Sequence, residues 1–301
     1  MKYKQTISNN TGVKKNEFLP GYSYEDGIRF DVEDPVNEMM EIMARFLIEY
    51  LSDGAKVLDI GAGSGALKHY MAQLNPSIDI ITLDGNPDTK LSPFIDKDKH
   101  FIVRTDKEYK IVDETGNCVK FDLIVSFEHL EHIQEENFEQ FLNNILNHSC
   151  EKTVFFATAA KWEHEGENEK HVHCNVKTSD EWASYFKDFL NKNSRAPIGY
   201  VCDLKKYADV VRENLLQTLP HARPIGGSER PWRHSGMPSA EMRPAPAPAI
   251  LHEMYDYFFC SPFALLDEEG WAWGGPDQSG YGGWGHRLFE STIIFLSGYK
   301  I

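Results

Sequence analysis

The feature that most constrains the fold is a short apolar strand that runs directly into a glycine-rich turn. Residues 56–60 (Lys-Val-Leu-Asp-Ile) are followed by Gly61-Ala62-Gly63-Ser64-Gly65, and a helical apolar stripe begins at Leu67. Strand, glycine turn and helix in this order are typical of a doubly wound parallel sheet. There the turn lies at the carboxyl edge, where glycine lets a ligand approach the backbone and the helix N-terminus attracts negative charge. The turn therefore predicts a nucleotide-type site.

Strands and helices alternate along the rest of the chain. The spacing of apolar residues predicts a helix that begins at Pro35 with Asp34 as its N-cap, and Thr178 with Glu181 forms a capping box for a later helix. Alternation of this kind predicts an α/β fold with a doubly wound, mostly parallel, seven-stranded sheet. The predicted strands cover residues 56–60, 78–83, 100–104, 121–126, 153–158, 197–202 and 291–296.

Composition limits the partners of the chain. With 31 Lys and Arg against 46 Asp and Glu, its 301 residues carry a net charge of −15, which opposes binding to a long nucleic acid. The apolar stretches are too short to cross a membrane, and the N-terminus is polar, without a secretory signal. Five scattered cysteines without a CxxC pair indicate reduced thiols in a cytoplasmic protein.

The glycine turn alone leaves two cofactor classes open. Gly61 to Ala66 also satisfies the GxGxx(G/A) pattern of dinucleotide-binding enzymes, and Asp84 stands about 20 residues further on, where a ribose-binding acid is expected. Asp59, however, stands two residues before the first glycine. Its carboxylate would repel a pyrophosphate and attract the ammonium group of a methionine moiety.

Three motifs carry a resemblance to a known family. Residues 57–65, Leu83-Asp84 and residues 121–133 (Phe-Asp-Leu-Ile-Val-Ser-Phe-Glu-His-Leu-Glu-His-Ile) resemble class I S-adenosylmethionine-dependent methyltransferases, which have a Rossmann-like fold. The resemblance implies S-adenosylmethionine as cofactor, bound through its methionine part at the glycine turn. It also implies a ribose site at Asp84 and Gly85, an adenine side at Asp106, and a sulfonium near Ser126 and Phe127.

The segment after the fourth strand carries a Glu/His grouping. Glu128, Glu131 and His132 are spaced i, i+3, i+4, so they share one face if the segment is helical. Such a group suits acid–base chemistry or a divalent cation. The segment resembles two methyltransferase groups that use E-x-x-E-H with a metal: ubiquinone-pathway O-methyltransferases and small-RNA 3′-terminal 2′-O-methyltransferases. In the RNA group a later histidine completes the set, for which His171 and His173 are the matching residues.

These motifs define the expected organisation and roles. We expect an N-terminal arm and helix (residues 1–54), a cofactor-binding core (55–203), an insertion that covers the acceptor site (204–287) and a last core strand (288–301). The insertion joins strands six and seven and is rich in Pro, Gly and Trp. His132, Glu128 and His171 are the catalytic candidates, and a metal would use Glu128, Glu131, His132 and His173. A purely structural role of the Glu/His pair, as a helix cap, stays open.

The predicted activity is methyl transfer from S-adenosylmethionine to a hydroxyl or amine of a small polar molecule, such as a sugar or natural-product intermediate. Three alternatives stay open: an RNA 3′-end 2′-O-methyltransferase, an NAD-dependent oxidoreductase, and a cofactor-binding protein without catalysis. Acceptor identity, metal use and a homodimer are not decided by the sequence.

Overall fold

The computed structural model describes residues 3–6, 10–13, 35–48, 51–150, 153–160, 173–192, 198–203, 264–267, 270–273 and 292–297. The chain divides into two compact units. The first consists of Met1–Cys202 together with Ser291–Ile301, and the second is Asp203–Glu290. Residues 204–263 of the predicted insertion lie outside the described residues.

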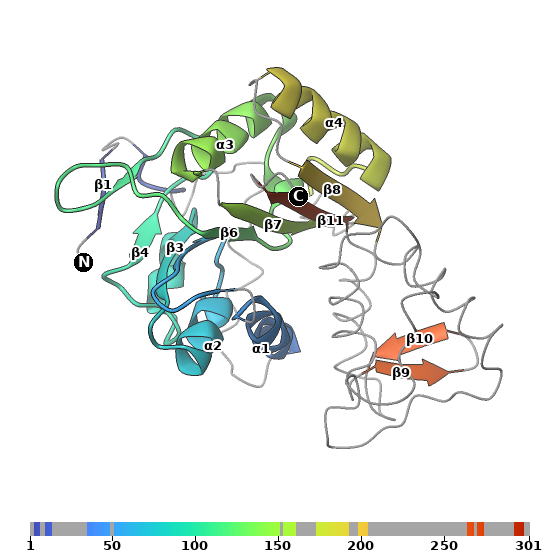
Figure 1. Cartoon of the computed structure of the whole chain (residues 1–301), viewed down its shortest axis with the longest axis horizontal. Coiled ribbons are helices and arrows are strands. Elements are labelled where there is room, and N and C mark those ends of the chain that lie inside the picture. Colours follow the sequence, from blue (N-terminus) through green and yellow to red (C-terminus); the bar gives the residue numbers. More distant parts are fainter. Residues whose placement is uncertain are drawn as a thin grey trace. The chain divides into compact units, whose positions relative to one another are not determined.

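The first unit is built on a seven-stranded sheet (Figure 1). Five neighbouring strands are parallel, and the last strand of the chain pairs antiparallel with the fifth of them. The α/β fold with a five-strand parallel core is therefore confirmed. In spatial order the strands are β4 (His100–Ile102), β3 (Asp79–Asp84), β2 (Lys56–Ile60), β6 (Leu123–Ser126), β7 (Val154–Ala159), β11 (Thr292–Ser297) and β8 (Ile198–Asp203).

The central strands β2 and β6 are mostly apolar, and both of their faces are covered. Val57, Leu58 and Ile60 of β2 are fully buried, and β6 is buried at every position from Leu123 to Ser126. This pattern is typical of parallel strands with helices on both sides of the sheet. It places the carboxyl ends of β2, β3, β4 and β6 at one edge.

The helices lie on both sides of that sheet (Figure 1). One side carries α1 and α2, which contact each other, and the other carries α3 and α4. The helix predicted from Pro35 does begin there. The described helices are α1 (Pro35–Ile48), α2 (Ala66–Leu74), α3 (Glu135–His148) and α4 (Ser179–Lys192), with 3-10 turns η1 (Pro87–Leu91) and η2 (Leu130–His132).

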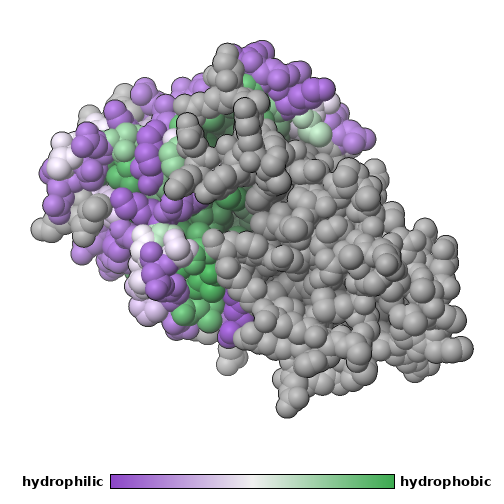
Figure 2. All heavy atoms as spheres, in the orientation of Figure 1, coloured by the Kyte–Doolittle hydropathy of each residue, from purple (hydrophilic) through white to green (hydrophobic). Residues whose placement is uncertain are grey.

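Aromatic side chains join α3 to α4. The Phe138 and Trp182 rings lie 5.1 Å apart between centroids, and both residues are fully buried. At the start of α4, the Thr178 backbone N–H donates to Glu181 Oε2 at 2.7 Å and the Glu181 N–H donates to Thr178 Oγ1 at 3.3 Å, so the capping box is confirmed. The outer surface of α4 is hydrophilic (Figure 2).

Two short strand pairs were not predicted from the sequence. In the first unit, β1 (Lys4–Gln5) pairs antiparallel with β5 (Ile111–Val112), which ties the N-terminal segment to the core. In the second unit, β9 (Ala264–Asp267) and β10 (Gly270–Trp273) pair antiparallel. Strands of two residues, such as β1 and β5, are too short to show a periodic pattern of apolar residues. Among the described helices, none is long and apolar enough to cross a membrane.

Candidate active site

The glycine turn between β2 and α2 is fixed to the neighbouring strand. The backbone N–H groups of Gly61 and Ala62 both donate to the carbonyl oxygen of Leu83, at 2.9 and 3.0 Å. Gly61 and Gly63 have φ values of +75° and +52°. A Cβ atom on Gly61 would lie 2.5 Å from His129 Cγ, whereas one on Gly63 would meet no atom of the described residues within 4 Å. The turn is therefore tightly packed at Gly61 and open at Gly63.

Asp84 at the end of β3 holds the turn through its side chain. Its Oδ2 accepts the Gly63 backbone N–H at 2.8 Å, and its Oδ1 accepts the Asn86 N–H at 2.7 Å. Burial raises the pKa of Asp84 to about 6, against the opposing effect of the backbone N–H donors. The predicted ribose acid thus lies beside the glycine turn, next to the buried Gly85.

Asp59 at the end of β2 is almost completely buried. Its Oδ2 has no hydrogen-bond partner among the described residues. Burial, followed by the negative charge of Asp84, raises the pKa of Asp59 to about 7. An unpaired buried carboxylate is costly, and a cationic ligand group near the turn would relieve that cost.

The end of β6 lies beside the end of β2. The Ser126 hydroxyl is buried and donates to the carbonyl oxygen of Ile60 at 3.1 Å. Phe127 is partly exposed, and its ring packs edge-on against Phe156 with centroids 5.5 Å apart. Both residues predicted to lie near the sulfonium are thus at the same sheet edge as the glycine turn.

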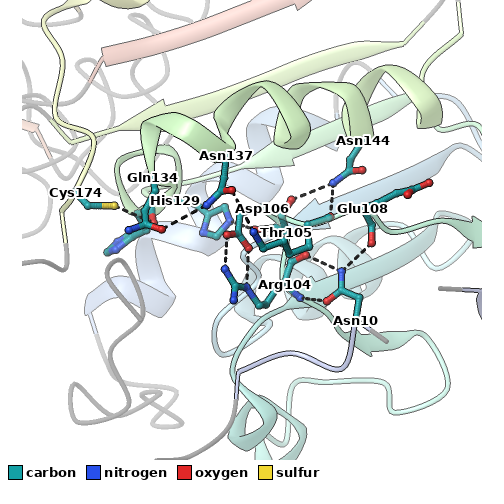
Figure 3. A network of polar contacts seen from close by, with 12 residues as sticks. Asn10, Arg104, Thr105, Asp106, Glu108, His129, Gln134, Asn137, Asn144 and Cys174 are labelled. Carbon is teal, nitrogen blue, oxygen red and sulfur yellow. Dashed lines mark hydrogen bonds and ion pairs between the residues drawn. The ribbon is translucent and has the colours of Figure 1, made fainter. Parts of the chain in front are cut away.

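Asp106, the predicted adenine-side acid, is engaged by a cation. Arg104 donates to its two carboxylate oxygens, from Nε at 3.0 Å and from a terminal nitrogen at 2.6 Å (Figure 3). Asp106 is buried, while the Arg104 side chain stays partly exposed. The sequence did not predict this ion pair. It leaves the carboxylate neutralised within the protein, after the end of β4.

The segment after β6 is not the helix that would place Glu128, Glu131 and His132 on one face. Glu128 has a left-handed backbone with φ of +45°, and its N–H donates to Thr158 Oγ1 at 3.0 Å. Only Leu130–His132 is helical, as a single 3-10 turn. The expectation of one shared helical face is therefore wrong, because the chain turns sharply at Glu128 before the 3-10 turn begins.

Three of the predicted metal-binding residues nevertheless come together. Ligand atoms of Glu131, His132 and His173 all lie within 4.8 Å of one another, while Glu128 is not part of this group. His132 Nε2 lies 4.0 Å from Glu131 Oε1, and the rings of His132 and His173 meet edge-on with centroids 4.9 Å apart. Both histidines are partly exposed.

Glu131 is the buried member of this Glu131/His132/His173 cluster. It has no exposed surface, and neither carboxylate oxygen has a hydrogen-bond partner among the described residues. Burial, followed by the charge of Glu128, raises the pKa of Glu131 well above its usual value. The loop that carries His173 is tied to it, since the Asn175 N–H donates to the Glu131 carbonyl oxygen at 2.9 Å.

His129 is a residue of the site that the sequence analysis missed. Its ring lies under Gly61, and its Nε2 is 2.8 Å from Thr105 Oγ1 in the loop after β4 (Figure 3). Burial lowers the pKa of His129 to about 4, against the opposing charge of Asp106. Hence a neutral imidazole joins the glycine turn to the β4 loop. The only sequence signal for His129 was its position in the motif of residues 121–133, between Glu128 and Leu130.

The catalytic candidate His171 lies outside the described part of the chain, as do the side chains of the arginine and tryptophan residues in the insertion.

Comparison with protein families finds a match within the first unit. A model described as "Methyltransferase domain" matches residues 33–189, more than half of the chain. This range contains β2 to β7, the glycine turn and the Glu131/His132/His173 cluster. A search of curated proteins finds no match.

Three methyltransferases are among the solved structures that match this chain. The plantazolicin methyltransferase BpumL in complex with S-adenosylhomocysteine is 14% identical, with 56% of this chain and 69% of that chain covered and a TM-score of 0.43. Coclaurine N-methyltransferase, bound to N-methylheliamine and S-adenosylhomocysteine, is 15% identical over 92% and 75%, with a TM-score of 0.43. A TehB-like methyltransferase from Corynebacterium glutamicum is 20% identical over 54% and 76%, with a TM-score of 0.36.

Proposed function

The chain belongs to the methyltransferase domain family and is an S-adenosylmethionine-dependent methyltransferase, and we propose that it methylates a hydroxyl or amine of a small polar molecule, with His132 as the proton acceptor. Family membership also decides between the two cofactor classes that the glycine turn alone left open. An NAD-dependent oxidoreductase is therefore not retained.

The ends of β2 and β3 support a site for S-adenosylmethionine. Asp84 faces the glycine turn and has the acidic character that ribose hydroxyls need. Asp59 supplies a buried negative charge for the ammonium group of the methionine part. Among the described residues nothing fills the space beside Gly63, so a ligand can approach the backbone of the turn there.

The observation that carries the proposal is a partly exposed imidazole beside a buried carboxylate at the same sheet edge. His132 Nε2 lies 4.0 Å from Glu131 Oε1. Methyl transfer from a sulfonium is a direct displacement: the acceptor oxygen or nitrogen bonds to the methyl carbon as the carbon–sulfur bond breaks. A neutral histidine near the acceptor can take the proton that the hydroxyl or amine loses, and Glu131 would orient it.

The same cluster fits a divalent cation, which the resemblance to the two E-x-x-E-H groups implies. Glu131 offers a buried carboxylate without a hydrogen-bond partner among the described residues, and His132 and His173 offer two imidazoles within reach. These three residues would hold the cation, which would polarise the acceptor hydroxyl. A cation-dependent RNA 3′-end methyltransferase is the second candidate, and this cluster is the observation that favours it.

The charge of the chain supports a small acceptor over a polymeric anion. At −15, the protein repels a long phosphate backbone. A small molecule that carries at most a single carboxylate or phosphate is therefore the acceptor that we propose.

The test is a His132→Ala variant of the full chain. A panel of small hydroxyl and amine compounds is first screened with the wild type for S-adenosylhomocysteine formation. With the best acceptor, we expect His132→Ala to lower kcat by about 100-fold or more, because general-base catalysis is lost. Its Kd for S-adenosylhomocysteine should stay near that of the wild type.

Two controls make this result specific. His69→Ala removes a partly exposed histidine on α2 that is bonded to Gln73, and it should leave kcat unchanged. The assays are repeated with EDTA and with added Mn²⁺. Activity that is insensitive to both supports His132 as the proton acceptor, whereas activity lost in EDTA and restored by Mn²⁺ would assign the cluster to a cation. Unchanged turnover of His132→Ala would remove His132 from the reaction.

A further inference from the structure

The N-terminal segment of residues 10–13 is bound to the two loops that follow β3 and β4. The Val13 backbone N–H donates to the Gly85 carbonyl oxygen at 2.8 Å, directly after Asp84. The Asn10 side chain accepts the Arg104 N–H at 2.7 Å and donates to the carbonyl oxygens of Arg104 and Glu108 at 2.9 and 3.0 Å (Figure 3). Asn10 and Val13 are both buried. Four residues thus bridge two loops that lie about 20 positions apart.

Gly12 permits the close approach of this segment. Its φ is +80°, and a Cβ atom there would lie 2.3 Å from Ile102 Cγ2 and 2.7 Å from the Gly85 carbonyl oxygen. A side chain at position 12 would therefore push the segment away from the ends of β3 and β4. Because Gly85 has no side chain, the backbone of residues 10–13 can pack directly against it.

The bridged loops carry the residues that the family resemblance assigns to the nucleoside half of the cofactor. Asp84 and Gly85 are the residues expected on the ribose side, and Asp106, which is held by Arg104, is the residue expected on the adenine side. Because Asn10 binds the Arg104 backbone and Val13 binds Gly85, the segment sets the distance between the two sides.

We propose that residues 10–13 are an outer wall of the adenosine site and that Asn10 and Gly12 contribute to cofactor affinity by positioning the loops after β3 and β4. The proposal rests on the proposed function, since it needs S-adenosylmethionine to bind there. The ligand class is a 5′-thioadenosine: S-adenosylmethionine, S-adenosylhomocysteine or 5′-methylthioadenosine. Asn10 and Gly12 are positioning residues, as they act through Arg104 and Gly85.

The experiment compares the full chain with its Asn10→Ala and Gly12→Ala variants by calorimetry. S-adenosylhomocysteine and 5′-methylthioadenosine, which lacks the amino-acid part, are the two probes. We expect both variants to bind both probes about tenfold more weakly, the effect of losing hydrogen bonds that hold a binding loop. Thr6→Ala is the matched control, because the Thr6 hydroxyl is exposed and bonds to Lys110 on the β5 side; it should bind both probes as the wild type does.

A second measurement needs no variant. Hydrogen exchange of the wild type is followed with and without 5′-methylthioadenosine, and we expect the Val13 amide to gain protection when the probe binds. This measurement decides the outcome if either variant fails to fold.

The results separate the inference from the proposed function. A wild type that binds neither probe overturns both. A wild type that binds them, with folded variants of equal affinity or with unchanged exchange at Val13, overturns only the wall at residues 10–13.

Discussion

Gly61 is the residue at which the cofactor turn meets the segment that carries the Glu/His cluster. Its positive φ suits glycine, and the His129 ring occupies the space that a side chain would need. Gly63 has a positive φ as well, but its Cβ position is open. Substitutions at the two positions therefore distinguish two costs: the strain of a left-handed backbone, which both share, and the steric clash with His129, which occurs only at Gly61.

We predict that Gly61→Ala lowers the free energy of unfolding by about 3 kcal/mol and Gly63→Ala by about 1 kcal/mol. In both variants an alanine must adopt a left-handed backbone, which is strained. Only in Gly61→Ala does the new Cβ atom also clash with the His129 ring. Urea denaturation without cofactor measures both values.

A double variant tests the steric part. His129→Ala makes room beside residue 61, so the cost of Gly61→Ala should fall by about 1 kcal/mol in that background. The cost of Gly63→Ala should be the same in both backgrounds. Equal costs for the two glycines in the wild-type background would contradict the packing of His129 under Gly61.

At the scale of elements, the ends of β2 and β3 bring two carboxylates together. The pKa of Asp59 is raised to about 7 and that of Asp84 to about 6. Both shifts are upward, so protonation of these groups stabilises the free protein; this contribution is full below about pH 4 and is lost as the pH rises through 6 to 7. A cofactor with an ammonium group has the opposite preference, since it binds the ionised carboxylates.

We therefore predict that affinity for S-adenosylhomocysteine falls as the pH is lowered from 8 to 5, while the melting temperature of Asp59→Asn depends less on pH than that of the wild type over the same range. Calorimetry and thermal unfolding measure the two effects. As a control, 5′-methylthioadenosine has no ammonium group, so its affinity should depend less on pH. An S-adenosylhomocysteine affinity that rises towards pH 5 would contradict an ionised Asp59 in the complex.

The loop after β4 shows how contacts distant in sequence build this edge. Asn10 holds the Arg104 backbone, and the Thr105 hydroxyl bonds to His129. From α3, the Asn144 amide donates to the carbonyl oxygens of Thr105 and Lys107 at 3.1 and 2.7 Å (Figure 3). Three segments that are distant in sequence thus fix one short loop.

This loop also explains what the sequence could and could not predict. Strand ends follow from apolar runs, and parallel topology brings them to one edge, so the sequence could predict that Asp59, Asp84 and Ser126 lie close together. The cofactor roles expected for Asp84 and Ser126 came instead from the resemblance to a known family. The hydrogen bonds of Asn10 and the packing of the His129 ring under Gly61 could not be predicted. They depend on tertiary packing, which produces no periodic pattern in the sequence. Spacing also misled at Glu128, because the i, i+3, i+4 rule assumes a helix and the chain has a left-handed residue there.

For the whole molecule, the charge of −15 bears on the choice between a small acceptor and an RNA end. At about 10 mM salt the screening length is about 30 Å, comparable to a small domain, so the negative field acts on a whole oligonucleotide. An RNA-binding protein would show its tightest binding under this condition, because counterion release favours association at low salt.

We predict that a fluorescently labelled single-stranded RNA shows no rise in anisotropy with this protein at low salt, with or without S-adenosylhomocysteine. Methyl transfer to its 3′ end should also be undetectable with added Mn²⁺. The matched control is the same RNA with a 2′-deoxy terminal nucleotide, which lacks the hydroxyl that an RNA 3′-end enzyme would methylate. Transfer to the first RNA but not to the second would mean that a basic surface outweighs the net charge. The cation-dependent alternative for Glu131, His132 and His173 would then replace the small-molecule proposal.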